Sequence, residues 1–297
     1  MGKKVQAKKI KKLIRALTLP SRPALMLEVR KVMNQFAPDP NVVARVISRD
    51  MALSAAVLYA ANSTLPGWKQ RVSSIRQAVV LLGLDEVKKL VSALFLQTAL
   101  VGKTSLEQQL RRQSVTTARA AAFIASQVGR VGRQFINGYL PHVAPDEAYM
   151  VALFHSCGIL MLIQIFPDYP DVYAAAMEDG EERLADLELD HYGFNHCQIG
   201  FLLMEKWNFP KFYARVLRCH HKSGHFSSKG RPVSERHEMS LQGVLALARW
   251  LAGEATDEEW RANRPVLMEL FGLDASVLNQ WMESFGKSSD YGVGDGS

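Results

Sequence analysis

The sequence lacks the usual markers of a secreted or membrane-spanning protein. Its three cysteines, Cys157, Cys197 and Cys219, are odd in number and form no C-x-x-C pair, so no disulfide framework is indicated. The first residues, MGKKVQAKKIKKLIRAL, have positive charge but no apolar segment followed by a small-residue cleavage site. No run reaches the roughly 18 consecutive apolar residues of a membrane-spanning helix. We therefore expect a cytoplasmic protein that does not span a membrane.

Motifs of phosphate-binding and nucleophilic enzymes are also missing. The chain contains no G-x-x-x-x-G-K-[ST], G-x-G-x-x-G or G-x-S-x-G segment. Ser156 follows His155 directly, but neighbouring residues on a helix diverge by about 100° and do not hydrogen-bond to each other. For Cys157, a small buried hydrophobic side chain is the simpler interpretation. The sequence therefore predicts no catalytic residue and no cofactor.

Negative charge is absent from the first 22 residues, which contain eight Lys and Arg residues. Because the formal net charge of the whole chain is +7, the other 275 residues sum to −1. A basic arm of this kind can contact nucleic acid or an anionic membrane surface. It has no aromatic side chains for base stacking, however. We interpret it as a solvated helix start and expect neither role.

Helical periodicity, in contrast, is present almost everywhere. Leu25, Val29, Met33 and Phe36 form an apolar stripe, and Asp39-Pro40, Asp50 and the Ser74…Gln77 pair are signals for helix starts. Strand-like alternation is scarce. The sequence predicts an all-α fold with helices that include 146–166 and 211–221 and with long connections at 129–146 and 222–235. The predicted organisation is a basic arm (1–18), an N-terminal helical lobe (19–104), a C-terminal helical lobe (105–285) and a flexible tail (286–297).

Several segments, in order along the chain, match the pattern of a known family. LPSRPALMLEVRKVMN resembles the start of bacterial HDOD domains, and FHSCGILML is similar to their "HDIGKL" helix. GFNHCQIGFLLMEKWNFPKFYARVLRCHH is similar to their "GFDHAEVGALLLERWGLP…IRHHH" segment. The resemblance runs from about Leu19 to His221. It implies an HD-superfamily-like helical bundle of two lobes and a signalling context, whereas the parent HD superfamily contains metal-dependent phosphohydrolases.

The resemblance also implies where the ligands of the parent metal site would lie. Gln113 stands where the first histidine is expected, and the HD pair itself has become His155-Ser156. Arg249 stands near the position of a distal aspartate. A serine hydroxyl is a weak neutral ligand, and Arg249 would oppose a divalent cation. We therefore predict no metal and no catalysis at this location.

Three further histidines, His196, His220 and His221, match positions of the family. If the helix over 211–221 is regular, His220 and His221 cannot both face one pocket. A zinc site made of the three cysteines and a histidine would need unrelated helices to converge, and no local pair supports it. The candidate residues of the former metal pocket are Gln113, His155, Ser156, His196, His220, His221 and Arg249. They either satisfy one another in the core, which we favour, or bind a small ligand.

The sequence leaves three functions to compare. The favoured one is a non-catalytic regulatory or scaffold protein in bacterial signal transduction, which binds an unidentified signalling protein or a small ligand. The alternative is a degenerate metal-dependent phosphohydrolase for a nucleotide or cyclic dinucleotide, which would need acids from outside the motif, such as Asp146, Glu147 or Asp190. The third is an adaptor that binds nucleic acid or a membrane surface through the basic arm.

Overall fold

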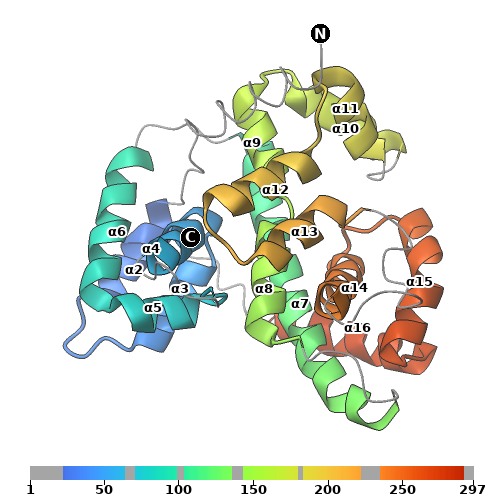
Figure 1. The fold of residues 1–297 in the computed structure, drawn as a ribbon, viewed down its shortest axis with the longest axis horizontal. Helices are drawn as coiled ribbons and strands as arrows, with labels where there is room; N and C mark the ends of the chain where they lie inside the picture. Colours follow the sequence, from blue (N-terminus) through green and yellow to red (C-terminus); the bar gives the residue numbers. More distant parts are fainter. Residues whose placement is uncertain are drawn as a thin grey trace. The chain divides into compact units, whose positions relative to one another are not determined.

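The computed structural model describes residues 23–63, 71–98, 104–135, 143–179, 183–221 and 235–290 (Figure 1). Within these ranges the regular structure is helical and contains no strand, so the prediction of an all-α fold is confirmed. The basic arm predicted for residues 1–18 lies outside the described residues, as does nearly all of the connection predicted for 222–235.

The chain divides into two compact units. The first contains the described residues of Met1–Val115 and Leu153–Arg218, and the second those of Thr116–Ala152 and Cys219–Ser297. Each boundary falls inside a helix, namely α7 (Ser105–Phe135), α8 (Pro145–Phe154) and α13 (Lys211–Cys219). The division into lobes near residue 104 stays a prediction.

The first unit begins with helices whose starts follow the local signals in the sequence. Asp39 accepts a hydrogen bond from the backbone of Asn41 at 2.8 Å, Asp50 from that of Leu53 at 2.9 Å, and Ser74 from that of Gln77 at 3.3 Å. The helices are α2 (Pro23–Met33), α3 (Pro40–Ser48), α4 (Met51–Ser63), α5 (Ile75–Leu82) and α6 (Leu84–Thr98).

The rest of the first unit contains a break that the sequence did not predict. The helix expected over 146–166 is divided, because α8 ends at Phe154 and α9 (Cys157–Ile165) begins only at Cys157. Ser156 has φ −94° and ψ 8°, outside helical geometry. The further helices are α10 (Tyr169–Asp179), α11 (Leu184–Tyr192), α12 (His196–Lys206) and α13.

The apolar stretch Pro145–Ile165 is long enough to cross a membrane by length and composition alone. However, 78% of its most apolar window is buried inside the structure, as in a core helix. At its centre the Phe154 ring lies 5.0 Å from that of Phe209 and 5.6 Å from that of Trp207, between ring centroids. This stretch is therefore weak evidence for a membrane span.

The second unit contains α14 (Arg236–Leu251), α15 (Asp257–Phe271) and α16 (Ala275–Asp290), together with the C-terminal part of α7. The connection predicted from residue 129 starts too early, because α7 continues to Phe135. Gly129 and Gly132 each cost a helix about 1 kcal/mol relative to alanine, which packing elsewhere can offset. On the same helix, the Phe123 ring packs on Phe285 at 6.0 Å between centroids. Residues 286–290 of the predicted flexible tail belong to α16, and residues 291–297 lie outside the described residues.

Candidate functional site

His155 and Ser156, which stand where the parent superfamily has its His-Asp pair, lie in the break between α8 and α9 and are buried. The Ser156 hydroxyl lies 2.6 Å from that of Ser114 on α7, and Ser114 donates to the Leu110 carbonyl at 2.8 Å. Because a hydroxyl has one proton, Ser156 is the donor to Ser114. Gln113 precedes Ser114 on α7 and is half-buried.

This arrangement does not fit the metal of the parent superfamily. A hard divalent cation needs charged oxygen ligands, whereas the position of the aspartate holds a neutral hydroxyl that is already bonded to a second hydroxyl. The contact between the two hydroxyls gives a physical reason to expect no catalytic metal site at His155 and Ser156.

Arg249 belongs to the second unit, where it is fully buried on α14. Its guanidinium forms an ion pair with Glu259 of α15, whose side chain is also buried. The positive charge of Arg249 is thus balanced by a carboxylate of its own unit. A buried pair of this kind is a structural feature and carries no sign of a ligand site.

A buried acidic residue that sequence reasoning missed holds His196 in place. One carboxylate oxygen of Glu188, on α11, accepts a hydrogen bond from the backbone N–H of His196 and lies 2.7 Å from its Nδ1. The other oxygen accepts a hydrogen bond from the Tyr169 hydroxyl. All three side chains are inaccessible to solvent. No local pattern marks Glu188, because its role depends on the packing of α10, α11 and α12.

The ring of His196 is oriented by this network. With Nδ1 directed at Glu188, Nε2 faces the Sγ atom of Cys197 at 3.4 Å. Burial lowers the pKa of His196, but electrostatic interactions and hydrogen bonds with Cys197 and Glu188 more than offset that effect and raise the pKa well above its usual value. For Cys157, burial raises the pKa of the thiol far above its usual range, which agrees with the interpretation of an inert hydrophobic residue.

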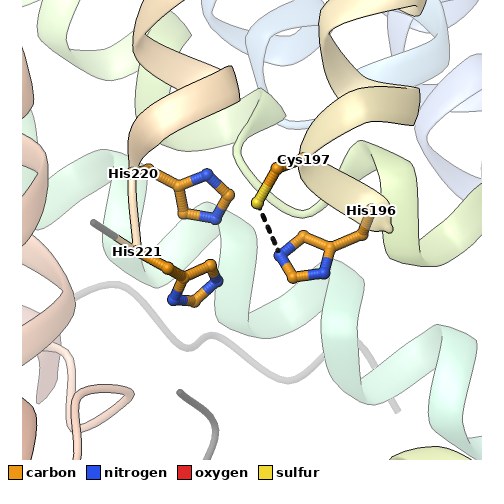
Figure 2. A group of neighbouring side chains, drawn as sticks. All are labelled: His196, Cys197, His220 and His221. Carbon is orange, nitrogen blue, oxygen red and sulfur yellow. Dashed lines mark hydrogen bonds between the residues drawn. The ribbon is translucent and has the colours of Figure 1, made fainter. Parts of the chain in front are cut away.

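His220 and His221 join His196 and Cys197 in one cluster, which Figure 2 shows. One donor atom from each of the four side chains lies within 4.8 Å of the others. The two neighbouring rings are 4.1 Å apart between centroids. The expectation that they diverge assumed a regular helix to residue 221, but α13 ends at Cys219 and both histidines lie in the turn that follows it.

The packing of α12 on α13 positions this cluster. Leu217 lies against Gly200, with its Cδ2 atom 3.4 Å from the point that a Cβ on Gly200 would occupy. Gly200 is three residues after Cys197, and Leu217 is three residues before His220, so this contact lies one turn from each half of the cluster. The cluster therefore depends on the N-terminus of α12 and the C-terminal end of α13.

A family model named HDOD domain matches residues 19–223, more than two thirds of the chain. The chain belongs to the HDOD family. The match begins after the basic arm and ends just after the cluster. It shows the family but assigns no role to any of these residues.

Two solved structures share this HDOD fold. The MmoQ response regulator from Methylococcus capsulatus (strain Bath) is 21% identical, with 90% of this chain and 98% of that one covered and a TM-score of 0.68. A virulence factor from Campylobacter jejuni is 17% identical, with 95% and 96% covered and a TM-score of 0.62. At these identities the similarity shows the fold alone.

One curated relative also matches the HDOD chain. It is an uncharacterised protein from Treponema pallidum (strain Nichols), 23% identical over 246 residues. The match covers 81% of this chain and 44% of that protein, so this chain spans less than half the length of the relative.

The structure brings together only some of the predicted site residues. His196, His220 and His221 form one cluster, to which Cys197 is an unpredicted addition. Ser156 forms a hydrogen bond with Ser114 instead. Arg249 is paired within the second unit. These contacts place the three histidines in one cluster and give Ser156 and Arg249 other partners.

Proposed function

We propose that this HDOD protein is a non-catalytic regulatory or scaffold protein in bacterial signal transduction, which acts by binding a protein partner or a small ligand. The observation that carries the proposal is the hydrogen bond between Ser156 and Ser114. In the parent enzymes the position of Ser156 holds a carboxylate that binds the metal. The serine hydroxyl supplies no negative charge to hold a metal ion that would activate water.

Two further observations support the same function. Arg249 stands near the position of the distal acidic ligand, and its guanidinium pairs with Glu259 and has no acceptor atom for a cation. The similar Methylococcus protein is named a response regulator, which agrees with a signalling role. A fold shared at this identity does not transfer a specific partner.

The absence of catalysis is tested first. The untagged protein is purified without chelators, supplied with Mn²⁺, and assayed against cyclic dinucleotides and a chromogenic phosphodiester. We expect no turnover above that of the His155→Ala variant, which is the matched control. Turnover that disappears in His155→Ala would contradict the proposal and favour the degenerate phosphohydrolase.

The binding role is tested by capture from a lysate of the source cell, with this chain as bait and the Methylococcus protein as a bait of the same fold. We expect at least one protein that prefers this chain and then binds the purified protein in titration calorimetry. If only shared background proteins are captured and no metabolite copurifies, the regulatory proposal fails.

A further inference from the structure

We propose that His196, Cys197, His220 and His221 form a Zn²⁺ site with four protein ligands, between the start of α12 and the end of α13 (Figure 2). The proposal goes beyond the regulatory function and does not depend on it. It revises the expectation from the sequence that no metal binds. That expectation was based on the incomplete ligand set of the parent HD site and on the lack of support for a zinc site made of the three cysteines and a histidine.

The donor set determines the choice of metal. Thiolates and imidazoles are the ligands that Zn²⁺ prefers, and a closed set of four protein ligands is typical of structural zinc. Mg²⁺, Ca²⁺ and Mn²⁺ prefer oxygen ligands, which none of the four side chains offers. This chemistry therefore differs from that of the carboxylate-containing HD site.

The spacing of the donor atoms is close to that of a zinc tetrahedron. Zn–N bonds of about 2.0–2.1 Å and Zn–S bonds of about 2.3 Å place neighbouring ligand atoms about 3.3–3.8 Å apart. Cys197 Sγ and His196 Nε2 are already 3.4 Å apart, and all four donors lie within 4.8 Å of one another. Small rotations of side chains are enough to close the site.

Glu188 provides a second, independent observation. Imidazoles that bind zinc usually donate their other N–H to a carboxylate or carbonyl, which fixes the ring and increases its basicity. The carboxylate of Glu188 contacts Nδ1 of His196 at 2.7 Å and leaves Nε2 directed at the cluster. His196 is therefore already oriented as a ligand, and Glu188 is its positioning residue.

Cys197 makes the site particular to this chain. The family segment that resembles residues 193–200 has alanine at this position. A chain with that alanine would offer only three histidine ligands at this site. Four protein ligands leave no open position for water or substrate, so the ion would stabilise the junction of α12 and α13 without hydrolysing anything. The site is thus compatible with a non-catalytic protein.

The test uses Co²⁺ as a spectroscopic substitute for Zn²⁺. The full-length, untagged protein is stripped with a chelator, which is then removed, and titrated with Co²⁺. We expect about one equivalent to bind with the intense visible bands of tetrahedral cobalt and a thiolate-to-cobalt charge-transfer band. One equivalent of Zn²⁺ should abolish both signals by displacing cobalt.

Three variants assign the ligands. Cys197→Ala should abolish the charge-transfer band, and His221→Ala should weaken Zn²⁺ binding at least about tenfold. His221 is half-buried, so its truncation removes little packing. Cys219→Ser, one residue before His220, is the matched control and should change neither signal. Circular dichroism checks that each variant is folded.

The role of Glu188 has its own readout. Glu188→Gln should weaken Zn²⁺ binding by about 10-fold to 100-fold and keep the charge-transfer band, because it removes orientation and not a ligand. If this variant does not fold, the Cys197 and His221 variants still decide the question.

Three results would overturn the proposal. They are a folded wild-type protein that binds no Co²⁺ at micromolar concentrations, an octahedral cobalt spectrum, and a charge-transfer band that persists in Cys197→Ala. None of these depends on whether a partner is captured, so the zinc site and the regulatory function can fail separately.

Discussion

At the residue scale, the Ser156 hydroxyl donates a hydrogen bond to the Ser114 hydroxyl, which can accept from a neutral donor but has no proton left to stabilise a carboxylate. Ser114 already donates its proton to the Leu110 carbonyl. A carboxylate at position 156 would be buried with its nearest hydroxyl proton committed elsewhere. We predict that Ser156→Asp lowers the free energy of unfolding by about 2–4 kcal/mol, measured by urea denaturation at pH 7.

Ser156→Ala is the control, since it removes a single hydrogen bond and should cost only about 1 kcal/mol. Equal stability of the two variants would mean that the site tolerates a charge. A rise in the melting temperature of Ser156→Asp with Mn²⁺ would restore the hypothesis of a parent-type metal site.

The buried ion pair of the second unit allows another prediction at this scale. Glu259→Gln would remove the carboxylate that pairs with the buried guanidinium of Arg249, which should cost about 3–5 kcal/mol in the free energy of unfolding. Glu258→Gln, at the exposed neighbouring position, should stay within about 0.5 kcal/mol of wild type. Similar values for the two variants in chemical denaturation would show that the pair contributes little.

At the element scale, the crossing of α9 and α12 depends on a glycine. A Cβ on Gly158 would lie 2.0 Å from the backbone carbonyl oxygen of His196, and neither backbone can move away cheaply. We predict that Gly158→Ala costs at least about 3 kcal/mol, although alanine favours a helix by about 1 kcal/mol. Thermal and urea denaturation measure the loss.

Gly200→Ala on α12 is the matched control for that crossing. The nearest atom to its added Cβ is Leu217 Cδ2 at 3.4 Å, an ordinary van der Waals contact at the end of a flexible side chain. This variant should be nearly as stable as wild type. If both alanine variants are tolerated equally, the two helices do not approach as closely as the structure has them.

The crossing of α9 and α12 explains why the sequence did not predict the break between α8 and α9. Helix starts at Asp39, Asp50 and Ser74 depend on residues two or three positions away, so they are readable locally. The break at Ser156 coincides with a backbone contact between segments nearly 40 residues apart. No periodicity encodes such a contact, and the helix was therefore expected to be continuous.

At the scale of the whole molecule, the order of family-like segments was enough to identify the fold, since the family match covers residues 19–223. The candidate site was predicted less completely. The three histidines were found from their positions in the family pattern, whereas Glu188 and Cys197 follow from how α11, α12 and α13 pack. Packing between elements, which resemblance to a motif does not specify, decides what a cluster can bind.

Charge is separated along the chain, and this property belongs to the whole molecule. Residues 1–18 contain seven Lys and Arg residues and no acid, so their deletion would bring the formal net charge from +7 to zero. Because we expect no nucleic-acid or membrane role for this arm, we predict that the full-length protein binds anionic vesicles and DNA only weakly and without sequence preference, through charge attraction that falls steeply with salt. The deletion variant should bind neither.

A variant with glutamine at the seven basic positions separates charge from length, and it should behave like the deletion. Both variants should unfold at the same urea concentration as wild type, because the family match begins only at residue 19. Vesicle sedimentation and fluorescence anisotropy at several salt concentrations measure the binding. If the deletion variant retains sequence-specific binding, the contact lies in the folded helices, and the interpretation of a solvated basic arm is wrong.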